Sequence, residues 1–255
     1  MTGNTQETVR EDERLDDLQF AGLHILQKKS GFCFGMDAVL LADFARIHPS
    51  DRVVDLGTGT GILPLLLCGR GKGSTFDALE IQQDMADMAA RSVQWNGLED
   101  RITVHPVPVE RIREILPVGS RDAVVCNPPY HGAGTSLPNP DPARNLARHQ
   151  GEGGLDAFLD AARWVLRVRG KLFMIYPAQR MLEAMQAMDR VHITPKRFRM
   201  VYPAVNRGAN LVLLEGVRDA KPPLHTEPPL IVYGPDGQMT EELRTIYHMT
   251  GPEDV

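Results

Sequence analysis

Short apolar runs alternate with amphipathic segments through most of the chain, and this alternation predicts its elements. Four runs rich in β-branched and apolar residues predict strands at 52–56, 74–78, 102–105 and 121–126. The segments between these runs have helical periodicity, at 62–68, 83–95 and 111–116. Strands and helices that alternate in this way are typical of an α/β domain with a parallel sheet.

The second half of the chain continues the pattern and changes it near the end. Helices are predicted at 155–169 and 179–188, and strands at 171–176, 195–203 and 210–217. A short loop joins the last two strands, so we expect them to pair as an antiparallel hairpin. The predicted fold class is therefore α/β, with a seven-stranded, mostly parallel sheet, an antiparallel C-terminal hairpin and helices on both faces.

The two ends of the chain differ from this core. Residues 1–14 are charged and lack apolar periodicity, which predicts a disordered tail. In residues 15–50, alternating apolar positions predict a small hairpin with its turn at Ser30-Gly31, and Asp37 is expected to cap the helix that follows. We expect a main domain at 51–218 and a proline-rich extension packed on it at 219–255.

Composition limits the classes of protein that need to be considered. The chain has 255 residues and a formal net charge of −5, so it has no overall basic field that would attract nucleic acid. Cys33, Cys68 and Cys126 lie far apart and the histidines lack metal-ligand spacing, so we expect free thiols and no metal. The N-terminus lacks the apolar stretch of a signal peptide and the longest apolar run is too short to span a bilayer, which predicts a cytoplasmic protein.

A glycine-rich loop at 57–61 joins the first core strand to the next helix. Glycines there let the backbone approach a ligand beside the helix N-terminus. The loop lacks the Gly-x-Gly-x-x-Gly spacing of dinucleotide sites, and Asp55 just before it suits an ammonium group better than a pyrophosphate. S-adenosylmethionine (SAM) has an ammonium group and no phosphate, so we expect SAM as the cofactor. The predicted contacts in this segment are Asp55, Gly57, Thr58 and Gly59.

Further cofactor contacts are predicted after the second and third strands and near the N-terminus. Glu80 ends the second core strand, where an acid can bond both ribose hydroxyls, and Ile81 can pack on the adenine. Pro108 and Val109 are expected at the adenine edge of the pocket. Phe34 and Asp37 are candidates to close over the cofactor, although Asp37 could serve as a helix cap alone.

The fourth core strand ends at Asn127-Pro128-Pro129-Tyr130. The prolines stiffen the backbone and hold the residue before them extended, so Asn127 points in a narrow range of directions. Asn127 Oδ1 and the Pro128 carbonyl can each accept a hydrogen from a planar NH₂ group, while Tyr130 offers a stacking face. Both acceptors together aim the amine lone pair at an electrophile. Asn127, Pro128 and Tyr130 are therefore the predicted catalytic residues, with Asn127 also touching the cofactor; the alternative is a proline-rich turn without chemistry.

Asp55 with the glycine loop, Glu80 and the Asn-Pro-Pro-Tyr segment together resemble the class I SAM-dependent amino-methyltransferases, which have a Rossmann-like fold. More narrowly, the chain is similar to the bacterial valine-tRNA (adenine-N6)-methyltransferases, which modify the adenine beside the anticodon. This resemblance covers nearly the whole chain. Its further segments are Gln27 with Phe32, Phe34 and Asp37, then 147–149, 196–199, 229–232 and 246–247.

The narrower resemblance implies methyl transfer from SAM to the exocyclic N6 of an adenine in the anticodon loop of a tRNA. Such an adenine is unpaired, so inserting it against Tyr130 costs little. The candidates to contact phosphates are Arg144, Arg148, Lys196, Arg197 and Arg199, for which a solvated charged face is the alternative.

The chain departs from the family pattern at two positions. Pro108 stands where the family usually has an acid that bonds the cofactor adenine, so a backbone contact from Val109 is expected instead. Gln150 stands where the family tends to have a glutamate after an Arg-His pair.

Other functions remain open. The same loop can hold the side-chain amide of a protein glutamine, as in release-factor methyltransferases; the negative net charge fits that substrate, whereas the basic strand at 195–203 fits RNA. DNA adenine is disfavoured because no DNA-reading domain is visible. A SAM-binding module without catalysis is disfavoured by the intact catalytic segment. We expect a monomer or a weak homodimer.

Overall fold

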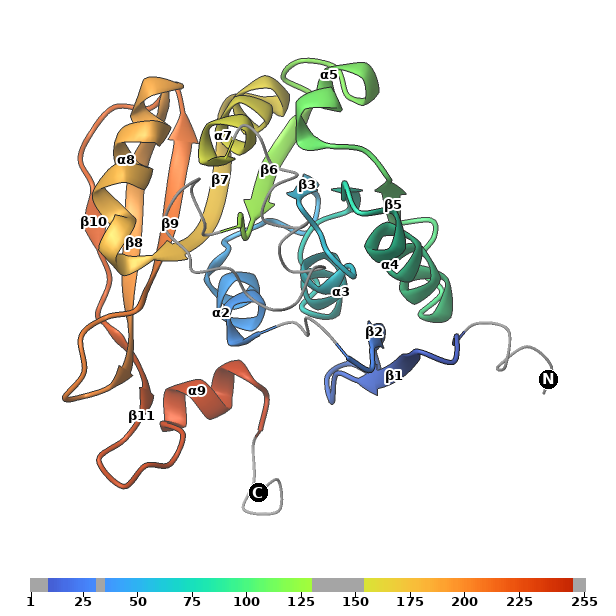
Figure 1. Cartoon of the computed structure of the whole chain (residues 1–255). Coiled ribbons are helices and arrows are strands. Elements are labelled where there is room, and N and C mark those ends of the chain that lie inside the picture. The colour runs from blue at the N-terminus through green and yellow to red at the C-terminus, as the bar shows by residue number, and fades with distance from the viewer. Residues whose placement is uncertain (1–8, 31–34, 130–153, 250–255) are drawn as a thin grey trace.

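The computed structural model describes residues 9–30, 35–129 and 154–249, and a nine-stranded sheet lies at its centre (Figure 1). The strands are β3 (Arg52–Leu56), β4 (Thr75–Leu79), β5 (Ile102–His105), β6 (Arg121–Cys126), β7 (Leu166–Pro177), β8 (Ile193–Ala204), β9 (Leu211–Arg218), β10 (His225–Thr226) and β11 (Leu230–Tyr233). Their order is β10-β8-β9-β7-β6-β3-β4-β5, and β11 also pairs with β8. The predicted α/β fold class is confirmed: the seven predicted strands are β3 to β9, and two short strands extend the sheet.

The sheet is parallel from β5 to β7 and changes direction at β9. Strand β9 is antiparallel to both β7 and β8, so the predicted antiparallel hairpin is confirmed. Strand β9 lies inside the sheet, between β7 and β8. Strands β10 and β11 pair with the outer side of β8 and cover backbone groups that an edge strand would leave unpaired.

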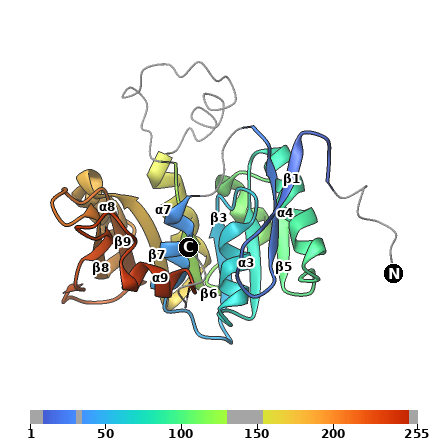
Figure 2. The same ribbon diagram turned by 90° about the horizontal axis from the view of Figure 1, so that it is seen from below.

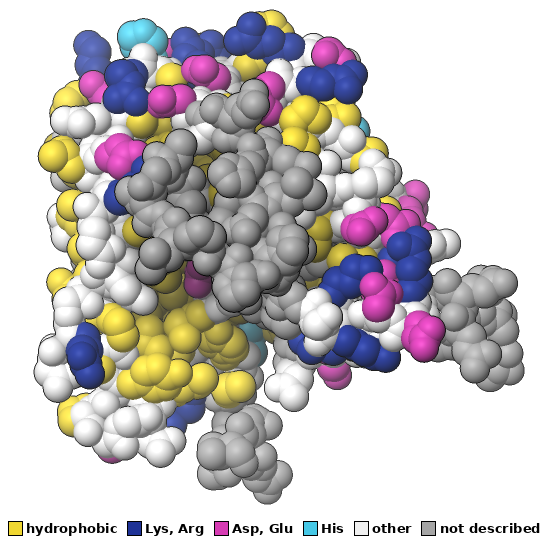
Figure 3. Space-filling view, in the orientation of Figure 1, with side chains coloured by type: hydrophobic (Ala, Val, Ile, Leu, Met, Phe, Trp, Pro, Cys, Tyr) yellow, Lys and Arg dark blue, Asp and Glu magenta, His cyan; other side chains and the backbone are white. Residues whose placement is uncertain are grey.

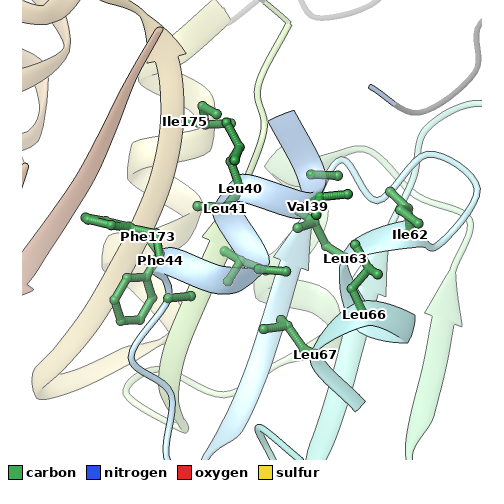
Figure 4. Packing of buried hydrophobic residues seen from close by; sticks show 14 of the residues in the cluster. Val39, Leu40, Leu41, Phe44, Ile62, Leu63, Leu66, Leu67, Phe173 and Ile175 are labelled. Atoms are coloured by element: carbon green, nitrogen blue, oxygen red, sulfur yellow. The ribbon is translucent and has the colours of Figure 1, made fainter. Parts of the chain in front are cut away.

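Helices cover both faces of the sheet (Figures 1 and 2). They are α2 (Met36–Phe44), α3 (Ile62–Gly69), α4 (Gln83–Trp95), α5 (Ile112–Ile115), α7 (Gly154–Val165), α8 (Met181–Arg190) and α9 (Glu241–Ile246), with 3₁₀ turns η1 (Val109–Arg111) and η2 (Ala178–Arg180). Alternate residues of β7 enter two different apolar layers, one with α2, α3 and α9 and the other with α5, α7 and α8. Figure 4 shows the first layer, in which Val39 of α2 lies beside Leu63 of α3 and Leu40 beside Ile175 of β7.

A separate two-stranded hairpin consists of β1 (Glu13–Asp17) and β2 (His24–Lys28). Its turn spans residues 18–23, so the turn predicted at Ser30-Gly31 is wrong. The strand pairs begin with Asp17 opposite His24, directly beside that turn. Strand β1 begins inside the segment that was predicted to be a tail.

Side-chain contacts anchor the hairpin on α4, and the charged sequence of this segment does not indicate them. The buried Glu13 carboxylate accepts two hydrogen bonds of 2.7 Å from Arg91. Asn96 accepts from the His24 backbone N–H and donates to the His24 carbonyl, so the open edge of β2 is paired with a side-chain amide. Ordered structure therefore begins before residue 15.

Two helix boundaries differ from the prediction. Gly35, not Asp37, is the N-cap of α2, and Asp37 lies in the first helical turn, where its charge is near the positive end of the helix dipole. Helix α7 ends at Val165 rather than at residue 169, because β7 begins at Leu166 and passes through Arg169 at a φ of 66°. That left-handed backbone is incompatible with a continuing helix.

Cys68 and Cys126 are free and buried, and Cys33 lies outside the described residues. Among the residues that the structure describes, no group of three or more His, Cys, Asp or Glu side chains could hold a metal ion. No helix in the same part of the chain has the length and apolar character needed to cross a membrane.

Candidate functional site

The carboxyl ends of β3, β4 and β6 meet at one edge of the sheet and bring three predicted segments together. Leu56, the last residue of β3, is opposite Leu79 of β4 and Cys126 of β6. The glycine loop, Glu80 and Asn127 follow these three residues directly. Open α/β sheets bind ligands outside the carboxyl ends of their strands, where successive connections leave on opposite sides. Strand β3 is that point here, so this edge is the candidate site.

The glycine loop is held by the end of β4. The backbone N–H groups of Gly57 and Thr58 both donate to the Leu79 carbonyl at 2.9 Å. The Gly59 N–H donates to Glu80 Oε2 at 2.8 Å. Gly57, Gly59 and Gly61 have positive φ values of 75°, 59° and 88°, which favour glycine. The three glycines are therefore required by the backbone that this loop adopts.

Open space and close packing alternate along this loop. A Cβ built on Gly57 would lie 3.1 Å from the Phe158 ring of α7, whereas one on Gly59 would meet no described residue within 4 Å. The loop therefore rests on α7 and is open at Gly59. The apolar spacing of Phe158 predicts a core position and does not indicate that its ring supports the glycine loop.

Asp55 is fully buried at the end of β3, and within the described residues neither of its carboxylate oxygens has a hydrogen-bond partner. The Thr58 hydroxyl is also buried and lacks a partner there. Burial raises the pKa of Asp55 to about 7; the Thr58 hydroxyl, close by but outside hydrogen-bond geometry, lowers it, and the charge of Glu80 raises it further. Buried polar groups are nearly always paired, so these two groups fit a ligand that donates hydrogen bonds or carries positive charge.

Glu80 is 5% exposed and holds two loops at once. Its Oε2 accepts from Gly59 N–H at 2.8 Å and its Oε1 accepts from Gln82 N–H at 2.9 Å. Burial raises the pKa of Glu80. Each carboxylate oxygen has a second lone pair, so the predicted ribose contact is compatible with both bonds. Ile81, the predicted adenine contact, is 41% exposed beside it.

Asn127 is half-buried and Pro128 is buried, directly after the apolar strand β6. The end of β6 is close to Asp55, since burial and then the Asp55 charge raise the pKa of the Cys126 thiol. Tyr130 lies outside the described residues. Two of the three predicted catalytic residues thus follow the strand next to Asp55.

The remaining predicted cofactor residues lie at the same edge or outside the described residues. Pro108 is half-buried and Val109 buried where η1 begins, after β5, whose end is tied to β4 by the bond from Glu80 N–H to the His105 carbonyl at 3.1 Å. Asp37 lies near Tyr247 of the C-terminal extension; burial and then the Asp37 charge raise the pKa of Tyr247 to about 12. Phe34 is outside the described residues.

Arg197 does not fit the predicted phosphate contact, because its side chain is only 8% exposed and its donors are used. It pairs with Glu215 at 2.6 Å and Glu227 at 3.0 Å, donates to the Phe44 carbonyl at 2.9 Å, and lies over the Phe44 ring. This buried arginine joins α2, β9 and the C-terminal extension. Its role is structural.

The neighbouring cations also contact the C-terminal extension. Lys196 donates to the carbonyls of Lys221 and Pro223 at 2.8 and 2.7 Å. Arg199 donates to the Pro228 carbonyl at 2.9 Å and pairs with Glu242 at 2.5 Å. Arg144, Arg148 and Gln150 lie outside the described residues.

Sequence comparison agrees with this arrangement. The family model described as "Methyltransferase small domain" matches residues 36–198. A tRNA1(Val) (adenine(37)-N6)-methyltransferase of Tolumonas auensis is 32% identical over 161 residues, which are 63% of this chain and 65% of that protein. One of Parabacteroides distasonis is 29% identical over 77% of this chain and 81% of that protein. The chain thus aligns with just under two thirds of the Tolumonas protein.

Solved structures show the same fold. A predicted O-methyltransferase from Agrobacterium tumefaciens has a TM-score of 0.68 at 22% identity, over 84% of this chain and 96% of that chain. P. horikoshii TYW2 in complex with MeSAdo has a TM-score of 0.56 at 14% identity, over 83% of this chain and 73% of that chain. The expected Rossmann-like methyltransferase fold is confirmed. Because the family match runs from α2 into β8, the chain belongs to the methyltransferase small domain family.

Proposed function

We propose that this chain transfers a methyl group from SAM to the exocyclic N6 of an adenine in RNA, in the anticodon loop of a valine-type tRNA. One observation carries the proposal: the Asp55 carboxylate, which has no hydrogen-bond partner among the described residues, lies on the strand next to β6, and β6 leads directly into Asn127-Pro128. The acceptor follows from relatives at 25 to 32% identity, which are named tRNA1(Val) (adenine(37)-N6)-methyltransferases.

The site fits SAM, because its orphaned groups match that molecule's charge. When bound, SAM supplies an electrophilic methyl group. Asp55, Thr58 and the open backbone at Gly59 would hold its amino-acid end, and Glu80 its ribose. Ile81, Pro108 and Val109 would contact the adenine of SAM, and Phe34 and Asp37 would close over the cofactor.

The residues after β6 orient the acceptor. Asn127 Oδ1 and the Pro128 carbonyl accept the two amine hydrogens, and Tyr130 stacks on the base. The amine lone pair is then directed away from the ring. No side chain has to act as a base before the bond forms, because the proton can leave afterwards.

Asn127→Ala tests this role. Loss of one preorganised acceptor should reduce turnover about 100-fold or more, while calorimetry should show that SAM still binds. Asn210→Ala, at an exposed asparagine of the β8–β9 connection, is the matched control and should keep full activity. An active Asn127→Ala enzyme would refute the proposed clasp.

Tyr130→Ala and Tyr130→Phe separate stacking from the hydroxyl. Stacking of a base on an aromatic ring contributes about 1–3 kcal/mol, so the alanine variant should bind RNA more weakly than the phenylalanine variant.

Methylation of a protein glutamine is the second candidate. The structure makes it a closer competitor, since Arg197, counted among the RNA contacts, is buried in ion pairs. Incubation with labelled SAM and either total tRNA or a fraction of ribosomal and release factors separates the two. We further propose a cytoplasmic monomer or weak homodimer that works without metal, with Arg144, Arg148, Lys196 and Arg199 near the RNA.

A further inference from the structure

Most cationic side chains in the described part of the chain are already occupied. Four are not: within those residues Arg169, Arg207, Lys221 and Arg244 have no side-chain hydrogen bond, ion pair or ring contact. All four are exposed. A free cation on a surface of negative net charge is available to an anionic partner at no cost to the fold.

The strand pairing shows which end of the strands each of these cations is near, the end that carries the candidate site or the opposite end. Arg169 lies between Leu166 and Lys171, which pair with the start of β6, and Lys221 follows the end of β9; both are at the edge opposite the site. Arg207 is in the loop between β8 and β9, beyond the pair Val201–Leu211, at the edge of Asn127. Arg244 is on α9. Arg207 is thus the free cation that the strand ends bring to the site edge.

The loop that contains Arg207 has no negative charge of its own. The loop at 205–210 contains no acidic residue, and its first residue, Val205, is 62% exposed. Figure 3 shows hydrophobic side chains gathered on the surface in the region where Figure 1 places α9 and the lower ends of β8 and β11. Nothing on this loop repels phosphate.

Strand geometry gives the separation between the loop and the site. Cys126 shares a row with Met174, Leu214 and Phe198. Arg207 lies two to three strands across from Asn127 and several residues further along, which amounts to roughly 25 Å at standard strand spacings. An adjacent nucleotide cannot bridge that distance, but a paired stem attached to the inserted loop can.

We infer that Arg207 binds a backbone phosphate in the stem of the RNA whose unpaired adenine enters the site at Asn127. This inference rests on the proposed function. Duplex backbone carries one charge per about 1.7 Å of axis, so an arginine at this distance meets phosphate whatever the stem sequence. The residue positions RNA and does not read bases.

The test compares Arg207→Gln with Arg169→Gln, a matched loss of one free arginine at the opposite edge. Two RNAs are used: an anticodon stem-loop and a single-stranded oligonucleotide of the loop alone. Arg207→Gln should weaken stem-loop binding about fivefold and reduce the slope of log K against log salt by about 0.9, the value for one duplex phosphate. Binding of the short oligonucleotide and Kd for SAM should not change, and Arg169→Gln should match the wild type throughout.

Equal effects of the two variants, or an equal effect of Arg207→Gln on both RNAs, would overturn the inference. Methylation of the stem-loop by the wild-type enzyme is measured in parallel. If the wild-type enzyme fails to methylate RNA, the proposed function is wrong. If the wild-type enzyme methylates RNA and Arg207→Gln binds the stem-loop with wild-type affinity, only the role inferred for Arg207 is wrong.

Discussion

Asp55 is a single residue of the candidate site that lowers the stability of the ligand-free protein. Its carboxylate is fully buried without a partner in the described residues, which a folded chain tolerates only where another requirement applies. A bound ammonium group would supply that partner. The residue is therefore expected to weaken the empty protein and to strengthen the complex.

Asp55→Asn should stabilise the protein in the absence of SAM. The folded pKa of about 7 exceeds the ordinary 3.8, so the folded chain keeps a proton that the unfolded chain loses. Stability of the wild type therefore falls as the pH rises from about 4 to about 7. Asp55→Asn lacks this loss, so its free energy of unfolding should exceed that of the wild type by at most roughly 4 kcal/mol at pH 8. The difference should shrink as the pH falls towards about 4.

Urea unfolding at pH 5 and pH 8 measures this difference, and SAM should bind the variant more weakly. Asp122→Asn is the control, and its expected change in stability at pH 8 has the opposite sign. Burial raises the pKa of Asp122, but hydrogen bonds from Arg52 and Arg167 outweigh it and lower the pKa overall. Asp122→Asn should lose stability at pH 8; a gain there, or no gain for Asp55→Asn, would count against the assignment.

Which residues of the site could be predicted depended on whether local sequence determines their position. Glycines with positive φ, an acid at a strand end and an asparagine before prolines are local features, and Asp55, Gly57, Glu80 and Asn127 were predicted from them; the strand ends bring these four residues to one edge of the sheet. Arg197 was misassigned because its partners Glu215 and Glu227 come from later segments. Charge in a sequence does not reveal whether it is paired.

At the scale of elements, the C-terminal extension is attached to the domain through β8. Strands β10 and β11 pair with it in parallel, and Arg197 joins β8 to α2, β9 and Glu227. Lys72 gives α2 a second anchor: its ammonium donates to the carbonyls of Ala42, Asp43 and Ala45 at its end. These contacts fix the helix that begins beside the site.

Arg197→Met should destabilise the fold by about 3–5 kcal/mol, because it leaves Glu215 and Glu227 without their buried partner. The change is measured as a lower urea midpoint. Lys196→Met, at a half-buried neighbour whose ammonium bonds only two carbonyls, should cost less, about 1 kcal/mol. Weaker RNA binding by a fully stable Arg197→Met protein would show instead that the arginine contacts phosphate.

Periodicity predicted the central strands and helices well, and α4 and β5 have the predicted bounds. The predictions are wrong where contacts with distant segments of the chain determine a boundary or a strand neighbour. The turn of the first hairpin follows from its docking on α4, and α7 ends early because Leu166 pairs with Arg121. Likewise the insertion of β9 between β7 and β8 is a choice of partner that no local pattern encodes. The predicted domain boundaries stay predictions.

At the scale of the whole molecule, the two ends of the described chain meet on the main domain. Phe20 of the hairpin turn stacks on His248 at 4.2 Å, and Arg70 lies over the Phe20 ring while donating to the Ile246 carbonyl at 2.6 Å. The N-terminal hairpin and the C-terminal extension thus pack on the sheet as one body. Their contact lies at Arg70, beyond the end of α3, whereas the candidate site lies at the glycine loop where α3 begins.

We propose that the residues at this edge of the sheet methylate an exocyclic adenine amine in tRNA. The direct measurement is nucleoside analysis by mass spectrometry of tRNA incubated with the purified protein and isotopically labelled SAM, alongside the same assay on protein factors. We expect labelled N6-methyladenosine in a valine tRNA with the wild-type protein, and at least about 100-fold less label in the same time with Asn127→Ala. Label in a protein factor, or none in any acceptor while SAM binds normally, would contradict it.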